Sequence, residues 1–78
     1  MYALVIAEDV DERALLSAVL QRVGLAVVAD NSPAHAIGTW PERPADMIVV
    51  VQEGAPSELP SIVRRLRGVT EVPLVTVS

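Results

Sequence analysis

Four of the ten acidic side chains, Glu8, Asp9, Asp11 and Glu12, fall within five consecutive residues, directly after an apolar run. Carboxylates concentrated in this way either remain solvated beside the end of a strand or belong to a functional site, and the elements around them must decide between the two. Asp11 is expected to cap a helix, and Glu12 to complement the dipole of its first turn.

Few other side chains in the sequence are suited to chemistry. The chain has no Cys, and all six basic residues are Arg. His35 stands near the start of a short helical stretch, where an exposed side chain without a role is expected. Arg64, Arg65 and Arg67 fall in the last turns of another helix, where cations offset the dipole. None of these residues predicts a catalytic centre.

Composition limits the classes of protein to which the chain can belong. Its 78 residues allow one small domain, 1–78, with 51% hydrophobic residues and a net charge of −4. An acidic chain without a basic stripe argues against nucleic-acid binding, and no apolar run is long enough to cross a bilayer. We expect a cytoplasmic protein. A mean hydropathy of +0.43 is high for so small a chain, and indicates apolar surface that a partner would cover.

The order of the predicted elements gives the fold class. Apolar runs typical of buried strands occupy residues 2–7, 25–30, 45–51 and 72–77. The intervening stretches 11–24, 31–40 and 58–68 show helical spacing, with Ser32 and Pro33 opening the second and Gly24 closing the first. Helices that alternate with buried strands predict an α/β fold built on an open parallel sheet.

Functional side chains of an open parallel sheet lie just beyond the carboxyl ends of its strands. In this sequence those positions hold Glu8 and Asp9, Asp30 and Asn31, residues 51–53, and Ser78. We therefore expect these side chains to share one edge of the sheet.

The whole chain resembles the receiver domain of two-component response regulators. "LVIAEDVDERALLSAVLQRVGL" is similar to the first strand, acidic pair and first helix of that family. "VVADNSPAHAI", "RPADMIVVV" and "VPLVTVS" resemble the second strand with its helix, the third strand and the fourth strand. The resemblance implies a flavodoxin-like open parallel sheet of order 2-1-3-4, truncated after the fourth strand.

The resemblance also implies a chemistry that this sequence does not complete. In the family, an aspartate after the third strand accepts a phosphoryl group from a histidine kinase and joins the acidic pair, here Glu8 and Asp9, in holding Mg²⁺. The aspartate position falls on Val51 when counted from Asp46, or on Gln52 when counted back from Pro56. Neither side chain can form an acyl phosphate. Without that third oxygen donor, Glu8 and Asp9 are expected to bind Mg²⁺ weakly if at all, either as the vestige of a metal site or as solvated carboxylates.

Two further family features bear on the same chemistry. The switch hydroxyl of the family, which hydrogen-bonds the phosphoryl oxygen, falls on Ser78. Because no phosphoryl group is expected to form, Ser78 is expected to be an inert vestige. The lysine of the family has no counterpart, because the chain contains no Lys. Phosphorylation by the usual route is therefore not expected.

The same comparison predicts assembly. Without a fifth strand, the fourth strand of the predicted sheet is an exposed edge, and such an edge pairs readily with another chain. The expected contact residues are Val72, Leu74, Val75, Thr76 and Val77. We expect a homodimer or a domain-swapped assembly, although a chain cut from a longer response regulator would expose the same edge.

Three functions remain open at this point. The first is a degenerate receiver, not an enzyme, that acts by protein–protein contact in a signalling pathway without aspartyl phosphorylation and without a required cofactor. The second is a receiver that uses a non-standard acid with Mg²⁺, such as Glu53 or Asp46. The third is a nucleotide-binding α/β fragment, which ranks last because all four glycines are isolated and form no phosphate-binding loop.

Overall fold

The computed structural model describes residues 1–51 and 58–77, so the predictions made for Gln52, Glu53 and Ser78 lie outside the described residues. The described elements alternate as the sequence predicts. The strands are β1 (Tyr2–Ile6), β2 (Ala26–Asp30), β3 (Met47–Val51) and β4 (Leu74–Val77). The helices are α1 (Val10–Arg22), α2 (Pro33–Thr39) and α3 (Leu59–Arg67).

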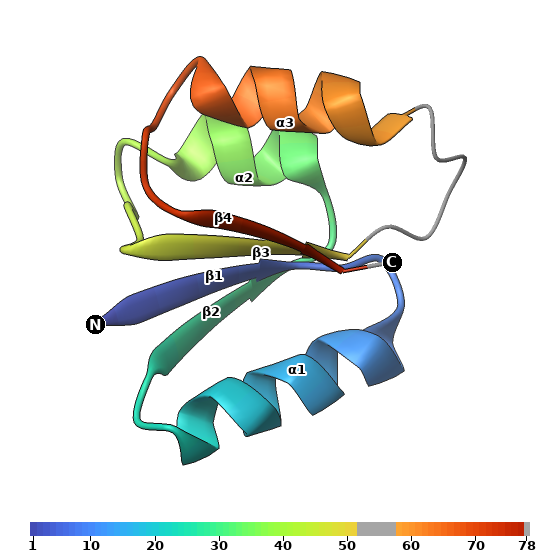
Figure 1. The fold of residues 1–78 in the computed structure, drawn as a ribbon, viewed down its shortest axis with the longest axis vertical. Helices are drawn as coiled ribbons and strands as arrows, with labels where there is room; N and C mark the ends of the chain where they lie inside the picture. The colour runs from blue at the N-terminus through green and yellow to red at the C-terminus, as the bar shows by residue number, and fades with distance from the viewer. Residues whose placement is uncertain (52–57, 78) are drawn as a thin grey trace.

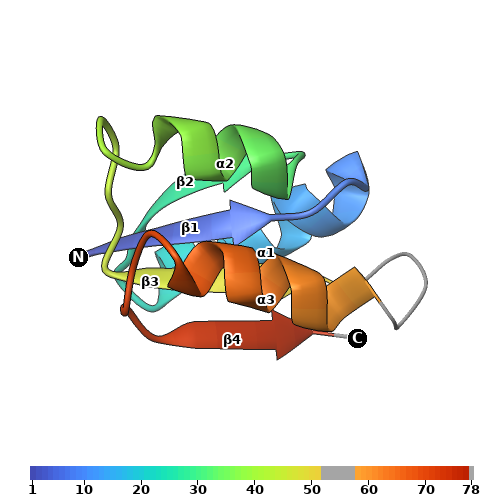
Figure 2. The same cartoon turned by 90° about the horizontal axis from the view of Figure 1, so that it is seen from above.

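The strands form one parallel sheet of order β2-β1-β3-β4. The predicted α/β class, the open parallel sheet and its order are confirmed, and the arrangement is flavodoxin-like. The sheet separates two unequal helical layers (Figure 1). Helix α1 lies on one face against β1 and β2, whereas α2 and α3 lie side by side on the other face (Figures 1 and 2).

The main core lies between the sheet and the α2–α3 layer. Successive strand residues point to opposite faces, so alternate residues of each strand enter this core. Its centre contains Leu4 and Ile6 of β1, Ile48 and Val50 of β3, and residues of the helical layer, namely Ala36, Trp40 and Leu66. The opposite face of the sheet buries Ala3, Val5 and Val49. Strands β1 and β3 are therefore covered on both faces, which explains why their sequences are apolar without alternation.

Local sequence signals place the helix ends, with one correction. Ser32 caps α2, as expected, by accepting a hydrogen bond from the His35 N–H. Pro60 falls in the first turn of α3, where a missing N–H is tolerated. The predicted cap of α1 was wrong: Asp9 accepts from the Asp11 N–H at 2.8 Å, so α1 begins at Val10. Asp9, and not Asp11, caps the helix because its backbone is extended and directly precedes the first helical residue, as a capping residue requires.

The fourth strand is shorter than expected, beginning at Leu74 instead of Val72. The backbone of Val72 is already bonded elsewhere: its N–H donates to Thr70 Oγ1, and its carbonyl accepts from Arg67 Nη1 at 2.6 Å. Pro73 has no N–H with which to begin the ladder. Val72 therefore belongs to the turn before the strand, not to the exposed edge.

None of the helices in the described residues combines the length and the hydropathy that crossing a bilayer requires.

Candidate functional site

The acidic pair lies at the carboxyl edge of the sheet, as predicted. Glu8 and Asp9 follow β1 directly, and Asp30 closes the neighbouring strand β2 with Asn31 behind it. The Ala7 N–H donates to the Asp30 carbonyl at 3.0 Å, which holds these two strand ends together. The parallel register of β1 and β2 thus brings together the described polar residues that the sequence assigned to this edge, namely Glu8, Asp9, Asp30 and Asn31.

Hydrogen bonds to residues of α1 hold the loop that carries the acidic pair. Asp9 Oδ1 accepts from the Asp11 N–H, so one carboxylate oxygen is used in capping. Arg13, one turn into α1, donates from Nη1 to the Ala7 carbonyl at 2.8 Å and to the Glu8 carbonyl at 3.4 Å. The guanidinium therefore holds the backbone before the acids in place and adds positive charge beside them.

The end of β3 carries only alkyl groups at the described positions. Val51 is the last residue of the strand and pairs in register with Val77 of β4. Val50, one residue earlier, is 1% exposed and pairs with Ile6. Of the two positions to which the phosphoacceptor was assigned, Val51 is therefore an aliphatic strand end, and Gln52 lies outside the described residues.

Asp46, one of the two alternative phosphoacceptors, lies at the wrong edge of the sheet. Its Oδ2 accepts from the N–H of Tyr2 at 2.6 Å, beside the first residue of β1. The acidic pair follows the last residue of that strand. Because the two edges are separated by the full length of β1, Asp46 cannot join Glu8 and Asp9 in one site.

The described donors do not fit a magnesium ion. Across residues 1–51 and 58–77, no three His, Asp or Glu side chains are placed to hold a metal. Glu8 and Asp9 would need a third oxygen donor from β3, where Val51 offers none, and Asp9 also caps α1. We derive no chemistry through a metal at this edge.

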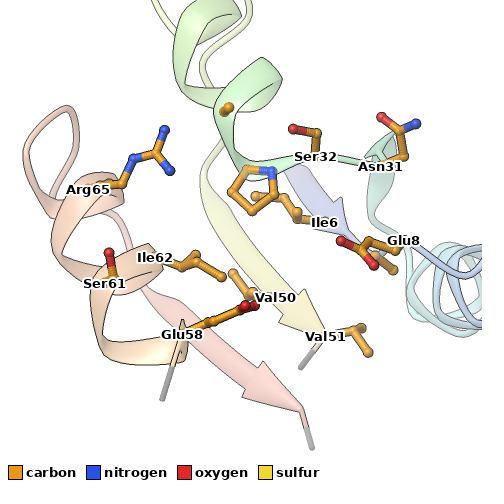
Figure 3. Close-up of a pocket in the computed structure, with 13 residues that line it drawn as sticks. Ile6, Glu8, Asn31, Ser32, Val50, Val51, Glu58, Ser61, Ile62 and Arg65 are labelled. Carbon is orange, nitrogen blue, oxygen red and sulfur yellow. The ribbon is translucent and has the colours of Figure 1, made fainter. Parts of the chain in front are cut away.

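A pocket of about 380 Å³ opens at the same edge, between the end of β1 and helix α3 (Figure 3). In the strand order β2-β1-β3-β4, β2 lies on one side of β1 and β3 lies on the other, so the direction of the connections reverses at β1. Such a switch point is where open α/β sheets bind ligands. The pocket floor is apolar, and its rim carries Glu8, Asn31, Ser32, Glu58, Ser61 and Arg65.

The rim includes α3 residues that the sequence analysis did not select. Glu58, Ser61 and Arg65 are spaced three and four residues apart, so they share one face of the helix. That spacing is a signal that could have identified them. The side of α3 that faces the strand ends, however, depends on how the helix packs.

His35 has a partner that the sequence analysis missed. Its Nδ1 lies 2.7 Å from Asp30 Oδ2, while Asp30 Oδ1 accepts from the Ser32 N–H at 3.1 Å. The imidazole is exposed, as expected, and the carboxylate is largely covered. The acid stands five residues before the histidine, across the turn from β2 into α2, where linear proximity gives no sign of contact.

A second candidate surface lies on the α1 side of the sheet. Leu15, Val19 and Val23 follow each other at four-residue intervals along and just beyond α1, and all three are exposed. Val75 and Val77 of β4 are also exposed, and they alternate with Leu74, which packs on the opposite core. We call these five residues, all on the α1 side of the sheet, the α1-side surface. Val75 and Val77 belong to β4, and no other strand of the described chain pairs with the outer edge of β4.

Comparison with protein-family models finds no match to this chain, and comparison with curated proteins finds none either.

Proposed function

We propose that this chain is a receiver-like module that is not phosphorylated on aspartate and that acts in a signalling pathway by contact with another protein, including a second copy of itself. One observation carries the proposal: the acidic pair stands at its expected place after β1, while β3 ends opposite it in Val51. An alkyl group cannot accept a phosphoryl group, so Val51 cannot serve as the phosphoacceptor that a receiver carries at the end of its third strand.

The fold supports the comparison with receivers. A parallel sheet of order β2-β1-β3-β4 with helices on both faces agrees with the flavodoxin-like sheet that the resemblance implies (Figure 1). Fold alone does not establish function, since flavodoxin-like sheets carry many chemistries. The acidic pair in the correct loop is the more specific support.

The surface supports a role in contact. A chain of 78 residues that leaves Leu15 and Val23 65% and 72% exposed has apolar surface that a partner could cover. The outer edge of β4, with which no other described strand pairs, adds backbone groups beside the exposed Val75 and Val77 that a second chain could bond. A homodimer that extends the sheet, or one that exchanges elements, would cover both features.

Labelling with acetyl phosphate and Mg²⁺, followed by intact-mass analysis, tests the absence of phosphorylation. We expect no hydroxylamine-sensitive phosphoryl group on the wild-type protein. The variants Val51→Asp and Gln52→Asp provide the matched comparison, because each restores a carboxylate at one of the two assigned positions. A phosphoryl group on the wild-type chain, at Glu53 for example, would establish the second function instead.

A further inference from the structure

The pocket at the carboxyl edge has a charge pattern that contact between proteins does not explain. Among the described residues, two acids and one base line it: Glu8 from the loop after β1, Glu58 directly before α3, and Arg65 from α3. Figure 3 shows Glu8 and Glu58 directed toward the space above Val50 from opposite sides, with Arg65 further along α3, on the α2 side. The pocket is therefore negative at one end and positive at the other.

The groups at the α3 rim are available to a ligand. In the described part of the chain, neither Glu58 nor Arg65 takes part in an ion pair, and Glu58 makes no capping hydrogen bond to its helix. The two stand seven positions apart, so at 1.5 Å per residue their backbones are about 10 Å apart along the axis of α3. A ligand that contacts both must therefore be elongated.

The floor between the charged ends is hydrocarbon. Ile6 and Val50 of the sheet and Ile62 of α3 line it, and Ile62 lies between Glu58 and Arg65 on the helix. A volume of about 380 Å³ falls within the usual range for small-molecule pockets. Ser61 supplies a hydroxyl beside Arg65, one helical turn away.

We propose that this pocket binds a small ω-amino acid zwitterion. Its ammonium group lies between Glu8 and Glu58, its carboxylate contacts Arg65 and Ser61, and its methylene chain covers Ile6, Val50 and Ile62. A simple anion would meet the two carboxylates, and a simple cation would leave Arg65 unmatched. The inference stands apart from the proposed function, because it needs neither phosphorylation nor dimerisation.

Titration with ε-aminocaproate, followed by amide chemical shifts in NMR spectra, tests the proposal. We expect saturable shifts confined to the pocket residues, with a dissociation constant of roughly millimolar order for so small a ligand with exposed charged contacts. Pentylamine and caproate, which each lack one of the two charged ends, are expected to bind at least about fivefold more weakly, because each loses one charge-assisted contact.

Arg65→Gln and Arg64→Gln form a matched pair, since both remove one exposed charge from adjacent positions of α3 and only Arg65 lines the pocket. We expect Arg65→Gln to weaken binding at least about fivefold and Arg64→Gln to leave it within about twofold. Glu58→Gln should weaken binding as Arg65→Gln does, with Glu71→Gln as its control. Unperturbed amide spectra away from the substitution show that each variant is folded.

Several results would overturn the inference. Shifts that do not saturate, or that spread over the surface, exclude a site in this pocket. Equal binding of caproate or of inorganic phosphate would make it an anion site, and equal binding of pentylamine a cation site. Equal effects of Arg64→Gln and Arg65→Gln would reduce the interaction to general surface charge. None of these results would alter the outcome of acetyl phosphate labelling.

Discussion

Asp30 connects the end of β2 to the start of α2 through both of its carboxylate oxygens. Oδ1 accepts from the Ser32 N–H, and Oδ2 lies 2.7 Å from His35 Nδ1. Its side chain is 10% exposed, whereas that of His35 is 67% exposed. The hydrogen bond to the backbone is therefore the contact that contributes more to stability, because water competes for the contact with the exposed imidazole.

Replacing Asp30 tests which of its two contacts, with the Ser32 N–H or with His35, contributes more to stability. We expect Asp30→Ala to lower the free energy of unfolding by about 1–2 kcal/mol, since the Ser32 N–H loses its acceptor. Asp30→Asn retains an oxygen at that place and removes the charge opposite His35, so its cost should be about half as large. Urea unfolding followed by circular dichroism measures both. Equal costs would mean that the contact with His35 dominates.

Residues differ in how far the sequence alone could place them. Glu8 and Asp9 follow a clear apolar strand, so their position at the carboxyl edge could be predicted from the pattern. The contact of His35 with Asp30 and the turning of Glu58 and Arg65 toward the strand ends could not be predicted. Both depend on the packing of α2 and α3 against the sheet, which no local pattern records.

Among the elements, the turn between α1 and β2 depends on one glycine. Gly24 has a φ of +97°, a conformation that residues with a Cβ rarely adopt. Its N–H donates to the Gln21 carbonyl, and the next residue, Leu25, donates to the Leu20 carbonyl. These two bonds close the end of the helix as a Schellman motif, with Gly24 at the position that requires positive φ.

Two glycine substitutions should have opposite effects. Gly24→Ala is expected to destabilise the protein by about 1–2 kcal/mol, because a Cβ is strained at positive φ. Gly38→Ala, within α2, should instead stabilise it by up to about 1 kcal/mol, since open space surrounds the new methyl group and alanine favours the helix. Thermal and urea unfolding measure both changes. A stabilising Gly24→Ala would contradict the strained turn.

Most elements could be predicted because their signals are local. The apolar runs of β1 and β3 arise from burial on both faces, and the Ser32–Pro33 pair marks the start of α2. The first residue of β4 could not be predicted, since the carbonyl of Val72 accepts from the guanidinium of Arg67, five residues earlier at the end of α3. Side-chain hydrogen bonds of this kind decide where a strand begins without leaving a pattern in the apolar run.

The whole molecule is asymmetric about its sheet. Helices α2 and α3 cover one face and enclose the main core, whereas α1 covers β1 and β2 on the other (Figures 1 and 2). Val75 and Val77 point to the α1 side at the outer edge of the sheet and remain exposed. This asymmetry is the physical reason for proposing a partner on the α1-side surface and the β4 edge.

Sedimentation equilibrium over a range of concentrations tests the proposed mode of action most directly, with wild type, Val75→Lys and Thr76→Lys compared. Both substitutions place a charge on β4, but Val75 belongs to the α1-side surface, and Thr76 alternates with it. We predict a wild-type dimer at micromolar concentration that Val75→Lys dissociates and Thr76→Lys weakens less. A wild-type chain that stays monomeric and folded throughout would contradict action through self-contact at this surface.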